Sequence, residues 1–77
     1  MTPEEWQEQQ QAIRDRLVES LIERVSGDPY PSTTMLDLIE QSMGLNHVEQ
    51  YAQALIDKIE QDQFPSLALM DRVRALL

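Results

Sequence analysis

Hydrophobic residues recur every three or four positions along four segments of the chain, which is the spacing of one face of an α-helix. Prolines, glycines and polar residues separate these segments, and no segment alternates apolar and polar positions as a strand would. The pattern predicts an all-α fold with four helices. The apolar positions are Trp6, Ile13, Leu17, Val18, Leu21, Ile22 and Val25, then Met35, Leu36, Ile39 and Met43, then Val48, Tyr51, Ala52, Leu55, Ile56 and Ile59, and finally Leu69, Met70, Val73 and Leu76.

The first helix has clear start and stop signals. Thr2-Pro3-Glu4-Glu5 matches a capping box with proline at the first helical position. Gly27 is expected to end the helix, and Pro29 and Pro31 prevent its continuation. The first helix is therefore expected to be long, at roughly 24 residues.

The other helices have shorter signals of the same kind. Ser32 and Ser66 each follow a proline and are expected to cap the second and fourth helices. Gly44 is expected to end the second helix. Asn46-His47-Val48-Glu49 matches another capping box, which predicts that the third helix begins there.

Two stretches of the chain align without a gap, 34 residues apart. Residues 21–40 and 55–74 share six identical positions of twenty, including Asp28/Asp62, Pro31/Pro65 and Ser32/Ser66. We interpret this as a tandem duplication of one helix–loop–helix hairpin, with residues 13–44 as the first and residues 45–77 as the second, inside a single domain of residues 1–77. The period is that of tetratricopeptide repeats, but their Trp, Leu-Gly and Tyr positions are missing. The two hairpins are expected to pack about a pseudo-twofold axis.

Residues 1–12 form an N-terminal extension with no counterpart in the second unit. The extension lengthens the first helix and is expected to leave part of its apolar stripe uncovered, including Ile13 and Leu17. It also carries the single tryptophan, Trp6. Tryptophan is enriched at protein interfaces, so Trp6 is a candidate contact residue. The alternative is that Trp6 packs on the fourth helix near Leu76 and Leu77.

The repeated element D-x-[YF]-P-S also has two interpretations. As scaffold, Tyr30 and Phe64 would plug the open ends of the hairpins, and Asp37 and Asp71 would meet the matched bases Arg24 and Lys58. As function, the element would form a pair of docking surfaces, with Tyr30 or Phe64 entering a partner's pocket. The candidate protein-interaction residues are therefore Trp6, Ile13, Leu17, Tyr30 and Phe64.

Composition excludes several function classes. Six bases against fourteen acids give a formal charge of -8, which disfavours direct binding to nucleic acid and to anionic membranes. There is no cysteine, and no constellation of residues fits a catalytic, metal, cofactor or small-molecule substrate site. The single histidine, His47, is expected to be exposed to solvent. The first residues lack the pattern of a signal peptide, so we expect a cytoplasmic protein.

The phrases DPYPSTTMLDLIE and DKIEQDQFPSLALMDRV resemble small acidic proteins of actinobacterial phages and prophages that repeat a Tyr/Phe-Pro-Ser element. The resemblance implies a setting in the infected host cell or the virion, as a minor structural or accessory part, and it carries over no functional residue. Two hypotheses follow. The first is a non-enzymatic interaction or assembly protein that binds a protein partner or forms a homo-oligomer. The alternative is an acidic mimic of nucleic acid that inhibits a nuclease or another DNA-binding protein.

Overall fold

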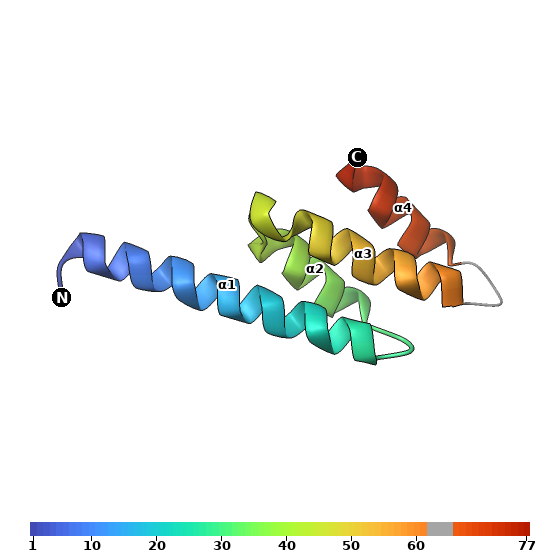
Figure 1. The fold of residues 1–77 in the computed structure, drawn as a ribbon, viewed down its shortest axis with the longest axis horizontal. Helices are drawn as coiled ribbons and strands as arrows, with labels where there is room; N and C mark the ends of the chain where they lie inside the picture. The colour runs from blue at the N-terminus through green and yellow to red at the C-terminus, as the bar shows by residue number, and fades with distance from the viewer. Residues whose placement is uncertain (62–65) are drawn as a thin grey trace.

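The computed structural model describes residues 1–61 and 66–77, which form four helices and no strand. The helices are α1 (Pro3–Gly27), α2 (Thr33–Ser42), α3 (Leu45–Gln61) and α4 (Leu67–Leu76) (Figure 1). The predicted all-α fold with four helices is confirmed. Phe64 lies outside the described residues.

The ends of α1 follow the sequence signals. The Thr2 hydroxyl accepts a hydrogen bond from the Glu5 backbone N–H at 3.2 Å, and the Glu5 carboxylate accepts one from the Thr2 N–H at 3.2 Å. These reciprocal bonds form the predicted capping box. The helix ends at Gly27, as predicted, although the glycine does not adopt a positive φ. Asp28 is the C-cap, and its backbone N–H donates to the Val25 carbonyl.

Serine side chains cap α2 and α4, as predicted. The Ser32 hydroxyl accepts from the Met35 N–H at 3.1 Å, and the Ser66 hydroxyl accepts from the Leu69 N–H at 3.3 Å. Each bond satisfies one backbone donor that a helix start leaves free.

The predicted start of α3 is wrong. The helix begins at Leu45, immediately after Gly44, and the Gly44 carbonyl accepts a hydrogen bond from the His47 N–H at 3.0 Å. Asn46 therefore lies inside the first turn and is not the cap. A Cβ atom at position 44 would come within 2.8 Å of the Asn46 amide oxygen, so the Asn46 side chain would have to move aside.

The core lies where α1, α2 and α3 meet. α1 packs against both α2 and α3, and α4 packs against α3. The half-buried Leu69, Val73 and Leu76 of α4 cover the core from one side, and no described residue of α4 is fully buried. The buried apolar residues are Val18, Ile22, Val25, Leu36, Ile39, Tyr51, Ala54 and Leu55.

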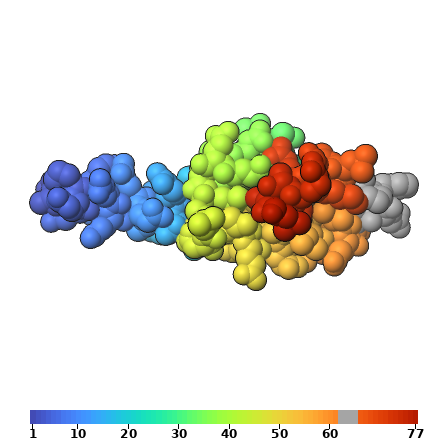
Figure 2. Space-filling model, turned by 90° about the horizontal axis from the view of Figure 1, so that it is seen from above, coloured from blue at the N-terminus to red at the C-terminus, as the bar shows by residue number. Residues whose placement is uncertain are grey.

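The N-terminal half of α1 protrudes from this packed body (Figures 1 and 2). Every residue from 1 to 14 is exposed, and the first buried residue of the chain is Val18. The molecule is therefore elongated, with principal extents of 51 × 24 × 17 Å. About half of the longest helix contributes nothing to the core.

Candidate interaction surface

The outer face of α1 carries an exposed row of apolar side chains. We call Trp6, Ile13 and Leu17 the α1 stripe; their exposed fractions are 46%, 57% and 45%. They are spaced seven and four residues apart, which places them on one side of a helix. Val18 and Ile22, which face the core, lie roughly 100° or more around the same helix from each of these three side chains. The α1 stripe therefore points away from α2 and α3.

Trp6 does not pack on α4. No contact between α1 and α4 is present among the described residues, and Leu77 is fully exposed. In Figure 1 the N-terminal end of α1 lies well away from the C-terminal helix. The alternative that Trp6 packs near Leu76 and Leu77 is wrong, and the indole is accessible.

A shallow hollow lies along the same face of α1. Ile13, Arg16, Leu17 and Ser20 line it. These four positions have the spacing i, i+3, i+4 and i+7, which is the hole that receives one side chain in knobs-into-holes helix packing. The α1 stripe thus ends at a hollow with the spacing that can accommodate a side chain from another helix.

Tyr30 does not plug the end of its helix pair. It follows α1 in the loop before α2, its side chain is 88% exposed, and its backbone N–H donates to the Asp28 carboxylate at 2.9 Å. The scaffold role expected of this ring is wrong. Trp6 and Tyr30 lie near opposite ends of α1, so the structure does not bring the two aromatic candidates together (Figure 1).

The expected ion pairs between the repeated acids and bases do not form among the described residues. Lys58 donates to the backbone carbonyl oxygens of Asp28 and Ser26. Asp71 pairs instead with Arg74 on its own helix, at 2.6 Å.

Arg72 of α4 joins three helices through a network that the sequence did not indicate. Its guanidinium lies 3.0 Å from the Asp37 carboxylate and 2.6 Å from the Glu40 carboxylate, both on α2. The Glu40 carboxylate also accepts a hydrogen bond from the hydroxyl of Tyr51 on α3. Burial of the phenol is the largest cause that raises the pKa of Tyr51 well above its ordinary value, and the hydrogen bond to Glu40 is the second. In this network Glu40 contacts Tyr51, 11 residues away in the sequence, and Arg72, 32 residues away, and no local pattern could reveal these contacts.

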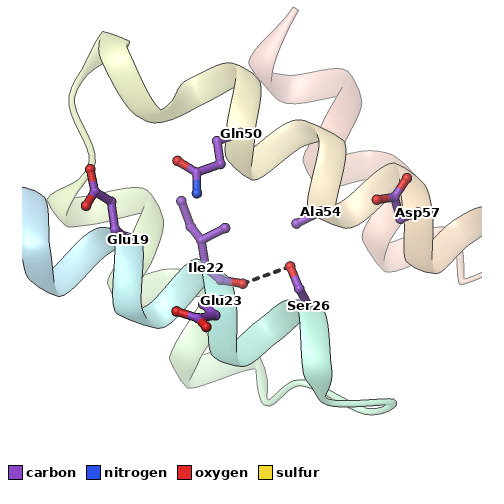
Figure 3. Close-up of a pocket in the computed structure, with 7 residues that line it drawn as sticks. All are labelled: Glu19, Ile22, Glu23, Ser26, Gln50, Ala54 and Asp57. Carbon is purple, nitrogen blue, oxygen red and sulfur yellow. Dashed lines mark hydrogen bonds between the residues drawn. The ribbon is translucent and has the colours of Figure 1, made fainter.

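An acidic groove runs between α1 and α3 (Figure 3). Glu19 and Glu23 line it from α1, and Asp57 lines it from α3. No basic side chain is among its lining residues. The groove therefore suits a positively charged group.

His47 is buried beside this acidic side of α1, with an exposed fraction of 2%. Its Nε2 lies 3.5 Å from the Glu19 carboxylate and 3.9 Å from the Asp15 carboxylate. Neither ring nitrogen has a hydrogen-bond partner among the described residues. The expectation that His47 would be exposed is wrong. In the part of the chain that the structure describes, no group of three or more His, Asp or Glu side chains is arranged to hold a metal ion.

No family model, curated protein or solved structure matches this chain. None of the described helices is both long and apolar enough to cross a membrane. The α1 stripe places three exposed apolar side chains on a protruding helix.

Proposed function

We propose that this chain is a non-enzymatic interaction or assembly protein that binds a protein partner through the α1 stripe. The observation that carries the proposal is the exposure of Trp6, Ile13 and Leu17 on one face of a helix that protrudes from the body. Tryptophan is enriched among the side chains that dominate binding energy. An isolated stretch of helix of about 12 residues is also marginal in water, so a covering partner would stabilise it.

The setting belongs to the same proposal. We place the protein in the cytoplasm of an infected cell or in a virion, as a minor structural or accessory component. We also propose that the α1–α2 and α3–α4 pairs are the two copies of a duplicated hairpin. Matching serine caps at Ser32 and Ser66 support that interpretation.

Affinity capture tests the function. The wild-type chain and the variants Trp6→Ala and Leu17→Ala are used as bait in an extract of the cells that produce the protein. We expect a defined set of proteins on the wild-type bait and its loss from both variants. Leu67→Ala is the matched control, because Leu67 is a 79% exposed apolar residue on α4. Equal capture by all four baits would contradict a role for the α1 stripe.

The acidic groove favours the second candidate, an inhibitor that mimics nucleic acid. Glu19, Glu23 and Asp57 bring three carboxylates to one groove, where a basic surface could bind them. We expect the triple variant Glu19→Lys, Glu23→Lys, Asp57→Lys to lose binding to a DNA-binding target found by capture. Reversing Glu49 and Glu60, which are exposed acids that do not line the groove, is the control. Undiminished binding by the triple variant would exclude this candidate.

A further inference from the structure

We propose that the partner of the α1 stripe is a second copy of this chain, paired antiparallel along α1, with Trp6 of each copy seated in the hollow of the other. This inference rests on the proposed function, since it names the partner of the same surface. It follows from two features of α1. The apolar stripe is complementary to itself about a point between Gln11 and Ala12, and the charge pair beside it, Glu5 and Arg16, is centred one residue away.

The apolar geometry sets the register of the pair. In an antiparallel pair, residues at equal distances from the twofold axis face each other. With the axis between Gln11 and Ala12, Trp6 of one copy faces Leu17 of the other. Leu17 lies in the hollow that Ile13, Arg16 and Ser20 complete. The largest exposed side chain of α1 thus meets the four-residue hole on the same helix of the second copy, twice per dimer.

Charges beside the stripe fit the same register. Glu5 and Arg16 are eleven residues apart, close to three helical turns, so they lie on the same flank of the stripe. In the antiparallel pair Glu5 faces residue 18 of the second copy, so it lies two residues, about 3 Å along the helix, from the level of Arg16. Among the described residues neither forms an ion pair within its own chain. Arg16 also lines the hollow, where its guanidinium can lie over the indole ring.

The order of charges along α1 favours an antiparallel pair over a parallel pair. Residues 1–11 hold Glu4, Glu5 and Glu8 and no base, whereas residues 12–23 hold Arg14 and Arg16 together with Asp15, Glu19 and Glu23. A parallel pair would align acids with acids and bases with bases, which is unfavourable. An antiparallel pair instead brings Glu5 of each helix near Arg16 of the other.

The body of the molecule leaves room for the pairing. Ser20 and Arg24 continue the outer face of α1 and are exposed, so α2 and α3 do not block a helix laid along it. Contact along about 18 residues spans roughly 27 Å. An interface of this length is near the lower limit for specific complexes, about 1,000 Å² in total. We therefore expect a reversible dimer with a dissociation constant of about 1–100 µM.

Sedimentation velocity over a concentration series, with Trp6 fluorescence as a second readout, tests the pairing. Trp6 is the single tryptophan, so its emission reports this site alone. We expect a monomer–dimer equilibrium, with emission moving to shorter wavelength as the dimer forms. Trp6→Ala should weaken dimerisation at least about tenfold, while the control Leu67→Ala leaves it unchanged. A chain that stays monomeric up to about 1 mM, or a dimer that Trp6→Ala does not weaken, overturns the inference.

Charge reversal tests the orientation. Glu5→Arg and Arg16→Glu should each weaken the dimer by about fivefold or more, and the double variant should restore it. Glu5→Arg also removes the capping bond from the Thr2 N–H to the Glu5 carboxylate, but the double variant lacks this bond too, so restoration cannot come from the cap. Glu4→Arg, on the opposite face of α1, is the matched control. A double variant as weak as the single ones overturns the antiparallel arrangement.

The outcomes separate this inference from the proposed function. A monomeric wild-type chain that captures another protein in a Trp6-dependent way overturns self-pairing and supports the proposed function. A dimer that depends on Trp6, Glu5 and Arg16 supports both.

Discussion

The buried polar side chains of this small core differ in how their polar atoms are satisfied. The Tyr51 hydroxyl donates to Glu40, whose carboxylate is held in turn by Arg72. His47 is equally buried, yet both of its ring nitrogens lack partners among the described residues. A buried polar group without a hydrogen bond costs free energy, whereas a satisfied network contributes to specificity and stability. The two side chains should therefore respond to substitution in opposite directions.

Replacement of His47 by leucine should stabilise the fold. Leucine fills a similar volume and removes two unsatisfied nitrogens, so we expect the free energy of unfolding to rise by about 1 kcal/mol. His47→Ala is the contrast, because it leaves a cavity and should lower stability by about 2 kcal/mol. Urea denaturation measures both. A loss of stability in His47→Leu would mean instead that the nearby carboxylates of Glu19 and Asp15 stabilise this ring.

Tyr51→Phe should lower stability and alter its dependence on alkaline pH. Loss of the hydroxyl removes the bond to Glu40, which costs about 1 kcal/mol near neutral pH. Folding raises the pKa of Tyr51, so the neutral phenol favours the folded state. That contribution is complete below the unfolded pKa of about 10 and falls as pH rises above it. The free energies of unfolding of wild type and Tyr51→Phe should therefore converge above about pH 10 in urea titrations. A constant difference between them would contradict the shift.

At the scale of the element, helix borders could be predicted far better than helix partners. Thr2, Ser32 and Ser66 each accept a hydrogen bond from a backbone N–H three residues further on, so the local sequence contains the whole interaction. The start of α3 was missed because Asn46 also fits a cap. The partners of Arg72 could not be predicted from the sequence, because they depend on how α2, α3 and α4 are placed in space.

Loss of the serine caps should have unequal effects on the two short helices. Ser32→Ala and Ser66→Ala each remove one capping bond, worth about 1 kcal/mol. α2 holds the buried Leu36 and Ile39, so Ser32→Ala should lower global stability by that amount. α4 has no fully buried described residue, so Ser66→Ala should mainly fray α4.

Hydrogen exchange distinguishes these two effects. In Ser66→Ala we expect faster exchange confined to α4 amides, with little change in α1, α2 and α3. In Ser32→Ala we expect faster exchange of the most protected core amides. Uniform acceleration throughout the chain in both variants would show that α4 is as firmly coupled to the core as α2.

At the scale of the whole molecule, the apolar pattern of α1 contains two faces that the sequence alone did not separate. Periodicity placed Trp6, Ile13 and Leu17 in one stripe with Leu21 and Val25. In the structure Val25 is buried and Leu21 is packed against the core, whereas the first three side chains point outward. Because α1 carries apolar residues on both faces, its sequence shows a single continuous apolar pattern. Only the placement of α2 and α3 decides which face is covered.

Removal of residues 1–11 should leave the body folded, because the protruding part of α1 contributes no buried side chain. All buried apolar residues lie at Val18 or beyond, and the Asp15 and Glu19 carboxylates near His47 are retained. The truncated chain loses the α1 capping box, whose bonds are exposed, so the free energy of unfolding should fall by no more than about 1 kcal/mol. Thermal unfolding followed by circular dichroism measures this change, and a melting temperature within about 8 °C of the full chain is expected.

Loss of cooperative unfolding would instead show that the extension stabilises the body, directly or through a partner chain. A truncated chain that is stable but no longer dimerises would separate the two roles of α1, folding in its second half and association in its first.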